Sequence, residues 1–300
     1  MSYAAAARNL TLHYLRKTSE IARGRLRRPI RYRPWRPLTN RDVPKRGCWC
    51  LLCGWRGEQF EGGLHSESAK CPRCGAVGRD RFLYLCMVQR VPYRRGLRVL
   101  ETSPRLGDDY RQAMRRRVDY LASDYDERAH RTELKLDLTR MELADGSLDL
   151  AMTAHVLEHI PDTDAALREL HRVLRPGGRA LIQVPLVQPA TAPPVEPEFH
   201  EDNTPVFWRF GFDLTERLRD HGFTATVLVT QDFRRRVLSL DTDWPEGISG
   251  EFDAIGMVKA ADPADLTVVA SDEVAERSWL RPSFMHAAWE CVKPVGVEGQ

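Results

Sequence analysis

Residues 148–185 read LDLAMTAHVLEHIPDTDAALRELHRVLRPGGRALIQVP, and this stretch decides the fold class. A short apolar run, Leu148–Thr153, is typical of a buried strand. Apolar residues then recur at helical spacing from Ala165 to Leu174, with charged residues between them. Pro176-Gly177-Gly178 ends this helix, and a second strand runs from Ala180 to Val184. A strand, a helix and a strand of this length predict a parallel sheet with a right-handed crossover.

The preceding segment predicts the other half of a nucleotide-binding sheet. Leu97–Leu100 is typical of a strand, residues 107–117 of a helix, and Val118–Ala122 of a second strand that ends near Asp124. In a Rossmann unit, an acidic residue at this distance from the first strand accepts hydrogen bonds from the ribose hydroxyls. Asp124 is therefore the expected ribose ligand, and Asp126 is the alternative.

Length and composition set the class of protein. At 300 residues, with 42% hydrophobic and 29% charged residues, the sequence has room for one sizeable α/β domain and a small module. No run of 18 apolar residues occurs, which argues against a transmembrane segment. The first residues lack the apolar core of a secretory signal, so we expect a cytoplasmic protein. Because the start is rich in Arg and poor in acids, an organelle transit peptide is the alternative.

Charge is distributed very unevenly along the chain. Residues 1–46 contain thirteen Lys or Arg residues against Glu20 and Asp42, a net charge of +11 that leaves −8 for the remaining 254 residues. Such a basic arm is attracted to phosphate, RNA, an anionic glycan or an acidic membrane surface. The alternative is a solvated tail that docks on the acidic body of the protein.

Four of the seven cysteines form two closely spaced pairs, Cys50–Cys53 and Cys71–Cys74, separated by 17 residues. This spacing is typical of a four-thiolate zinc site, in which each pair chelates the metal from one tight turn. A glycine follows each pair and permits the positive φ that such a turn needs. We therefore predict a structural zinc ribbon, with four thiolates and no open position for catalysis. Cys48 is a possible replacement for Cys50, and two disulfides in an exported protein are the alternative to zinc.

The stretch at 148–185 resembles the second half of class I S-adenosylmethionine-dependent methyltransferases of the type 11-like group. Residues 71–83, CPRCGAVGRDRFL, also resemble a segment found ahead of the catalytic domain in a zinc-ribbon subset of that family. Asp80 stands where the family pattern has a histidine. The resemblance implies an α/β, Rossmann-like sheet, mostly parallel with the last strand antiparallel, preceded by a small zinc ribbon.

The resemblance also implies a set of cofactor residues. It places Asp137 near the adenine amino group and the backbone of Leu138 at a ring nitrogen, although Asp137 also fits a turn cap before Met141. The loop after the first strand, residues 101–107, holds a single glycine where nucleotide-binding loops are usually glycine-rich. The hypothesis for this half of the site is that S-adenosylmethionine contacts residues in that loop, the two strand-end acids and the start of the next loop: Glu101, Ser103, Arg105, Gly107, Asp124, Asp137, Leu138 and Ala154.

The sequence identifies the methyl acceptor less well than the cofactor. Candidate catalytic residues lie past the ends of the fourth and fifth strands, and His155 and His200 are the predicted pair because a histidine titrates near neutral pH. The leading prediction is methyl transfer to a heteroatom, with a hydroxyl oxygen favoured, of a small-molecule or glycan-like acceptor. An RNA methyltransferase that holds RNA through residues 1–46 and the ribbon is the first alternative, and a non-catalytic binding protein is the second.

These patterns divide the chain into four parts. The predicted parts are a basic arm, a zinc ribbon with a connecting helix, a methyltransferase domain and a C-terminal extension, at residues 1–46, 47–92, 93–260 and 261–300. Within the third part, Thr224–Thr230 and Ala254–Lys259 are expected to form the final antiparallel pair of strands.

Overall fold

The computed structural model describes residues 30–39, 41–62, 68–126, 132–200, 203–243, 253–281 and 286–295. Residues 31–300 form one compact unit. This unit begins within the predicted arm. Residues 1–29, which contain most of the arm, lie outside the described residues.

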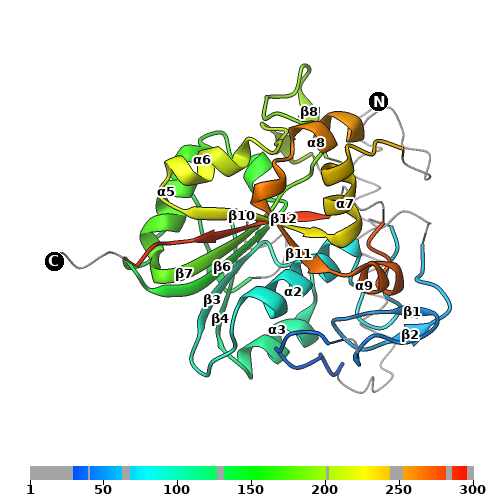
Figure 1. Ribbon diagram of the computed structural model, residues 1–300. Helices are drawn as coiled ribbons and strands as arrows, with labels where there is room; N and C mark the ends of the chain where they lie inside the picture. Colours follow the sequence, from blue (N-terminus) through cyan, green and yellow to red (C-terminus); the bar gives the residue numbers. More distant parts are fainter. Residues whose placement is uncertain are drawn as a thin grey trace, which may run out of the picture. The chain divides into compact units, whose positions relative to one another are not determined.

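The described elements alternate between strands and helices over most of the chain (Figure 1). The helices and helical turns are α2 (Gly78–Arg90), α3 (Asp108–Arg115), η1 (Leu157–His159), α5 (Thr163–Val173), α6 (Leu214–Asp220), α7 (Gln231–Ser239), α8 (Ala254–Ala260), η2 (Pro263–Asp265) and α9 (Asp272–Arg277). The main sheet contains β3 (Arg98–Thr102), β4 (Asp119–Asp124), β5 (Leu134–Lys135), β6 (Leu148–Ala154), β7 (Leu174–Gln183), β10 (Thr224–Thr230), β11 (Leu266–Ala270) and β12 (Ala287–Val292). Two small sheets pair β1 (Cys48–Trp49) with β2 (Arg56–Gly57) and β8 (Glu198–Phe199) with β9 (Pro205–Val206).

The main sheet has eight strands in the order β11-β10-β12-β7-β6-β3-β4-β5. β12 runs antiparallel to both of its neighbours, and the other neighbouring strands pair in parallel. The helices α5 and α6 lie on one face of this sheet, and α2 and α3 lie on the other (Figure 1). The predicted fold class, a mostly parallel Rossmann-like sheet whose last strand is antiparallel, is confirmed.

The order of the strands also predicts where a ligand binds. β3 pairs with β4 on one side and with β6 on the other, so the direction of chain progression reverses between β3 and β6. In open α/β sheets, ligands bind in the crevice outside the carboxyl ends of the strands at such a switch point. The loops that follow β3 and β6 are therefore the expected walls of a binding site.

The prediction that Ala254–Lys259 is a strand is wrong. These residues belong to α8, which the Asp253 side chain caps by accepting a hydrogen bond from the Gly256 amide at 2.7 Å. The antiparallel strand is β12, and β11 adds an edge strand beside β10. Both β11 and β12 come after residue 260 in the chain. The part of the chain that forms the main sheet therefore extends past the predicted domain boundary at residue 260.

Residues 31–39 contact the helix α2 and the residue that follows it. Trp35 is buried and its Nε1 donates a hydrogen bond to the Val91 carbonyl at 2.9 Å. Tyr84 donates its hydroxyl proton to the Arg33 carbonyl at 2.9 Å. Buried aromatic anchors of this kind hold the segment in place independently of its positive charge. In the part of the chain that the structure describes, no helix is long and apolar enough to cross a membrane.

Candidate functional site

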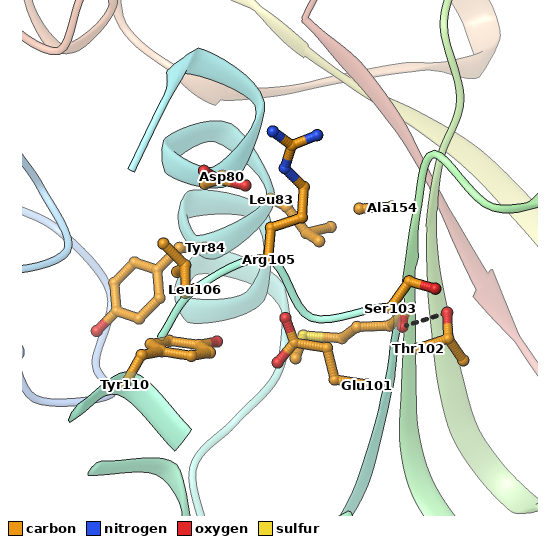
Figure 2. A pocket seen from close by; sticks show the side chains of 11 residues that line it. Asp80, Leu83, Tyr84, Glu101, Thr102, Ser103, Arg105, Leu106, Tyr110 and Ala154 are labelled. Atoms are coloured by element: carbon orange, nitrogen blue, oxygen red, sulfur yellow. Dashed lines mark hydrogen bonds between the residues drawn. The ribbon is translucent and has the colours of Figure 1, made fainter. Parts of the chain in front are cut away.

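A hollow opens at the carboxyl ends of β3 and β6 (Figure 2). Its walls come from the loop after β3, the end of β6, and the helices α2 and α3. The lining residues are Asp80, Leu83, Tyr84, Glu101, Thr102, Ser103, Arg105, Leu106, Tyr110, Met152 and Ala154. The hollow therefore lies at the switch point that the strand order predicts.

The hollow contains half of the predicted cofactor residues. Glu101, Ser103, Arg105 and Ala154 line it, whereas Gly107, Asp124, Asp137 and Leu138 are not among the lining residues. The four in the lining come from the ends of β3 and β6, the two strands on either side of the switch point.

The other four predicted cofactor residues lie outside the lining of the hollow. Gly107 precedes the first turn of α3, and Leu138 is buried in the core. Asp124 lies at the end of β4 and accepts a hydrogen bond from the Asp126 amide at 3.1 Å. Asp137 caps a turn, since its Oδ1 accepts from the Thr139 amide and hydroxyl at 2.8 and 2.7 Å. These are the contacts expected of the alternative role for Asp137, the cap of a turn.

Sequence reasoning missed the contribution of two helices to this hollow. Asp80, Leu83 and Tyr84 reach it from α2, and Tyr110 reaches it from α3 (Figure 2). Asp80 is the position at which the chain departs from the family-like segment after the ribbon, and this departure was the only signal in the sequence. Nothing in the spacing of the two tyrosines distinguished them from ordinary core residues.

Glu101 gives the hollow a carboxyl group with unusual electrostatics. Tyr120 donates its hydroxyl proton to Glu101 Oε2 at 2.7 Å, and Tyr110 lies beside the carboxyl group (Figure 2). Burial raises the pKa of Glu101 to about 7, the nearby Asp80 carboxylate adds to this effect, and the Tyr120 hydrogen bond opposes it. The group therefore titrates near neutral pH, and a ligand that donates hydrogen bonds to it favours its ionised form.

Two residues at the strand ends hold the left-handed backbone conformation that usually requires glycine. Ser103, after β3, has a φ of 47°, and His155, after β6, has a φ of 54°. Backbone hydrogen bonds fix both, from the Ser103 amide to the Ser123 carbonyl at 2.7 Å and from the His155 amide to the Gln183 carbonyl at 2.8 Å. The chain thus makes sharp turns at both strand ends without a glycine-rich loop.

The four predicted zinc ligands come together in the ribbon. The sulfur atoms of Cys50, Cys53, Cys71 and Cys74 all lie within 4.8 Å of one another. The Cys50–Cys74 sulfur distance is 3.6 Å and the Cys53–Cys71 distance is 3.7 Å. Four sulfurs bound to one tetrahedral Zn²⁺ at about 2.3 Å would be separated by about 3.8 Å, so the donor set fits a structural zinc ion.

The remaining details of the ribbon agree with this arrangement. Gly54 and Gly75 have φ values of 70° and 78°, as the turns after the two cysteine pairs require. The Cys48 thiol lies outside the cluster and donates to the Glu58 carbonyl at 3.3 Å. All seven cysteines are free thiols, so the disulfide alternative has no support in the geometry.

Comparison with known proteins gives a family match for the central part of the chain. Residues 106–182 match the family model described as a methyltransferase domain. Residues 106–182 form a methyltransferase domain. The prediction from residues 148–185 is therefore confirmed, because this match includes most of that stretch and the sheet has the expected topology.

Individual relatives match limited parts of the chain. An arsenite methyltransferase of Aquipseudomonas alcaligenes is 33% identical over 101 residues, which cover 31% of this chain and 27% of that protein. A 37.1 kDa protein in a transposon of Streptomyces fradiae is 49% identical over 49 residues, covering 16% of this chain and 14% of that protein. The chain thus spans less than a third of the length of these curated relatives. One similar solved structure is phosphoethanolamine N-methyltransferase 2 from Haemonchus contortus, in complex with phosphomonomethylethanolamine and S-adenosylhomocysteine. It is 19% identical to this chain, with a TM-score of 0.37. The match covers 68% of this chain and 50% of that one.

His155 directly follows Ala154, which lines the hollow. Arg79 Nη1 lies 3.0 Å from His155 Nδ1. An arginine can only donate, so Nδ1 accepts this hydrogen bond and the ring proton resides on Nε2. Burial and the Arg79 charge both hold the pKa of His155 well below its usual range, so the ring is neutral at neutral pH. In this state His155 is a hydrogen-bond donor through Nε2.

The second predicted catalytic residue, His200, lies elsewhere. It follows β8, is exposed, and its ring centre is 4.8 Å from that of His159. His159 in turn lies 3.8 Å from Oε1 of the buried Glu158, and His155 Nδ1 lies at the same distance from this oxygen. His155 and His200 therefore lie at opposite ends of one His-Glu cluster in the methyltransferase, and only His155 adjoins the hollow.

We expect the replacement of Glu158 by glutamine to stabilise the protein in alkaline solution. Glu158 is 1% exposed, and burial raises its pKa to about 8 from the ordinary 4.5. The folded protein retains this proton over a pH range in which the unfolded chain has lost it. The contribution of Glu158 to stability is therefore complete below about pH 4.5 and is lost as the pH rises through about 8.

Glutamine has nearly the same shape and does not ionise. Relative to the wild type, Glu158→Gln should therefore gain about 2–3 kcal/mol in unfolding free energy between about pH 6 and pH 9. Thermal denaturation at several pH values measures this gain, with Glu142→Gln at an exposed position as the control. A stability difference that does not change with pH would show that the Glu158 carboxyl is already ionised in the folded protein.

Proposed function

We propose that this chain is an S-adenosylmethionine-dependent methyltransferase that holds its cofactor in the hollow between β3, β6, α2 and α3. The observation that carries the proposal is the position of the hollow. It lies at the switch point of a methyltransferase sheet, and it presents a carboxyl group, a guanidinium group and aromatic side chains to one volume.

Each of these groups suits one part of the cofactor. The Glu101 carboxylate accepts hydrogen bonds from an amino group or from hydroxyl groups. The Arg105 guanidinium pairs with a carboxylate. Tyr84, Leu106 and Tyr110 provide apolar walls for the adenosine portion. When bound, S-adenosylmethionine supplies an activated methyl group on a positively charged sulfur.

The proposed acceptor is a heteroatom of a small or glycan-like molecule, with a hydroxyl oxygen favoured. His155, directly after the lining residue Ala154, donates through Nε2 and orients the acceptor oxygen toward the methyl group. Its Nδ1 is occupied by Arg79, so in this arrangement His155 positions the acceptor and does not remove its proton.

RNA is the second acceptor class, because the thirteen basic residues at positions 1–46 form an electrostatic footprint for phosphates. Seven of these thirteen precede residue 31, where the compact unit begins. A chain that begins at residue 31 therefore separates the two classes. RNA methylation would depend on the removed arm and on salt concentration, whereas small-molecule methylation would survive the truncation.

The proposal is tested by following the labelled methyl group of S-adenosylmethionine. Purified full-length protein and the truncated chain are each incubated with a low-mass metabolite extract and, separately, with total RNA. We expect both proteins to label the low-mass fraction equally. Label in RNA alone, lost on truncation, would replace the small-molecule acceptor by RNA. Cofactor binding without label in either pool would contradict enzymatic function and favour a binding protein.

A further inference from the structure

The helix α2 connects the cysteine cluster to the hollow. It begins at Gly78, four residues after the ligand Cys74, and it provides Asp80, Leu83 and Tyr84 to the lining. Most of its residues are buried, including all of residues 81–88. The position of this helix therefore affects both the ribbon on one side and the candidate cofactor site on the other.

Arg81 of α2 ties three segments together. It is 0% exposed, and its Nη1 donates to the Ala69 and Ala76 carbonyls at 2.9 and 2.8 Å. These two carbonyls lie on either side of the Cys71–Cys74 pair. Its Nε donates to the Ser278 carbonyl, directly after α9, at 2.7 Å. One side chain thus fixes the second cysteine pair, the helix and the end of α9 in one arrangement.

The environment of Arg81 is unusual for a fully buried cation. Its acceptors among the described residues are neutral carbonyl oxygens, and its guanidinium carbon lies 4.1 Å from the centre of the Phe60 ring. A buried charge is costly unless an opposite charge compensates it. Asp80 precedes it in α2, and the Cys71–Cys74 pair lies in the chain between the two carbonyls to which its Nη1 donates. These two cysteines belong to the predicted metal site.

Metal binding strengthens this compensation. Each cysteine ligand binds zinc as a thiolate, so four thiolates and one Zn²⁺ leave an excess of two negative charges at the centre. Without metal, this excess of negative charge is absent from the centre. Burial of the Arg81 charge is then less favourable. The electrostatic interaction that holds α2 beside the ribbon is weaker as a result.

We propose that Arg81 is the buried countercharge of the zinc centre and that zinc, through Arg81, holds α2 in place as a wall of the hollow. Arg81 is a positioning residue, since it does not line the hollow itself. The ribbon then acts as a brace for the catalytic domain in addition to any contact with a substrate. The inference rests on the proposed function only in treating the hollow as the cofactor site.

The first test measures zinc affinity by competition with a chromophoric chelator, in the absence of cofactor. We expect Arg81→Met to bind zinc at least about tenfold more weakly than the wild type, and Arg81→Lys, which keeps the charge, to recover most of this loss. Arg90→Met is the matched control, because Arg90 lies at the other end of α2 and pairs with Glu290 at 2.8 Å. Unchanged affinity in Arg81→Met, or equal losses in the Met and Lys variants, would overturn the countercharge role.

The second test uses the wild-type protein, so it does not depend on whether a variant folds. Amide hydrogen exchange is compared in the zinc-loaded protein, after removal of zinc by a chelator, and after zinc is restored. We expect exchange at residues 81–88 to accelerate at least about tenfold without zinc and to recover with it, while β6 and β7 stay protected. Unchanged protection of α2 would overturn the coupling. Neither test uses the cofactor, so failure of the methyltransferase proposal would be recognised separately.

Discussion

Replacement of Cys53 by serine is expected to remove the bound metal and to lower the thermal midpoint by more than about 10 °C. The sulfurs of Cys53 and Cys71 lie 3.7 Å apart in the cluster, and the described residues of the ribbon form two strands of two residues each. A module of this size cannot bury enough apolar surface to fold alone, so metal binding supplies most of its stability. Elemental analysis should find about one zinc per chain in the wild type and little in the variant.

Two other cysteines provide the controls for this experiment. Cys86→Ser changes a buried thiol on α2 that lies outside the cluster, and Cys48→Ser changes the thiol that donates to Glu58. Both variants should retain zinc. Loss of zinc in Cys48→Ser together with retention in Cys53→Ser would contradict the ligand assignment.

Replacement of Glu101 by glutamine is expected to weaken S-adenosylhomocysteine binding by about 10–100-fold at about pH 8. The glutamine retains the size of the side chain and its contact with Tyr120, but it removes the negative charge from the hollow. Hydrogen bonds to an ionised acceptor contribute about 1.5–3 kcal/mol, which corresponds to this loss of affinity.

The pH dependence of binding distinguishes a charge effect from a change of shape. Because burial raises the pKa of Glu101 to about 7, the wild-type affinity should increase between about pH 6 and pH 8 as the carboxylate forms. The affinity of Glu101→Gln should remain flat over this range. Glu133→Gln, at an exposed ion pair with Arg115, should behave as the wild type. A pH-dependent affinity that survives in Glu101→Gln would assign the titration to another group.

The sequence predicts the centre of the sheet well because its signals there are local. Leu148–Thr153 and the helix after it carry apolar periodicity, and the structure has β6 and α5 within two residues of the predicted bounds. The cysteine pairs are equally local, since each chelating turn is contained in a few residues. Local patterns of this kind do not depend on the rest of the fold.

The last strand could not be read from the sequence because tertiary contacts determine it. β12 contains Glu290, which interrupts an apolar run but is only 2% exposed in the structure. Arg90 and Arg179, each from a distant part of the chain, pair with its carboxylate at 2.8 and 3.0 Å. In contrast, the apolar residues of 254–259 fit a strand or a helix equally, and the Asp253 cap decides for the helix.

The sequence predicts part of the candidate site, because local signals identify the ends of strands but not the packing of helices. Glu101 and Ala154 follow strands that the sequence identifies, and both line the hollow. Asp137 has the side-chain type that the family requires, yet it caps its own turn. Tyr84 and Tyr110 enter the hollow from helices whose position depends on packing, and no spacing rule reveals that position.

A calorimetric titration of the zinc-loaded protein with S-adenosylhomocysteine tests the central claim most directly. If the hollow at the ends of β3 and β6 is a cofactor site, the titration should show one binding site per chain, and filling the hollow by Ala154→Trp should abolish the signal. Absence of binding to the wild type, or full binding to the Ala154→Trp variant, would contradict the assignment of this hollow as the methyltransferase cofactor site.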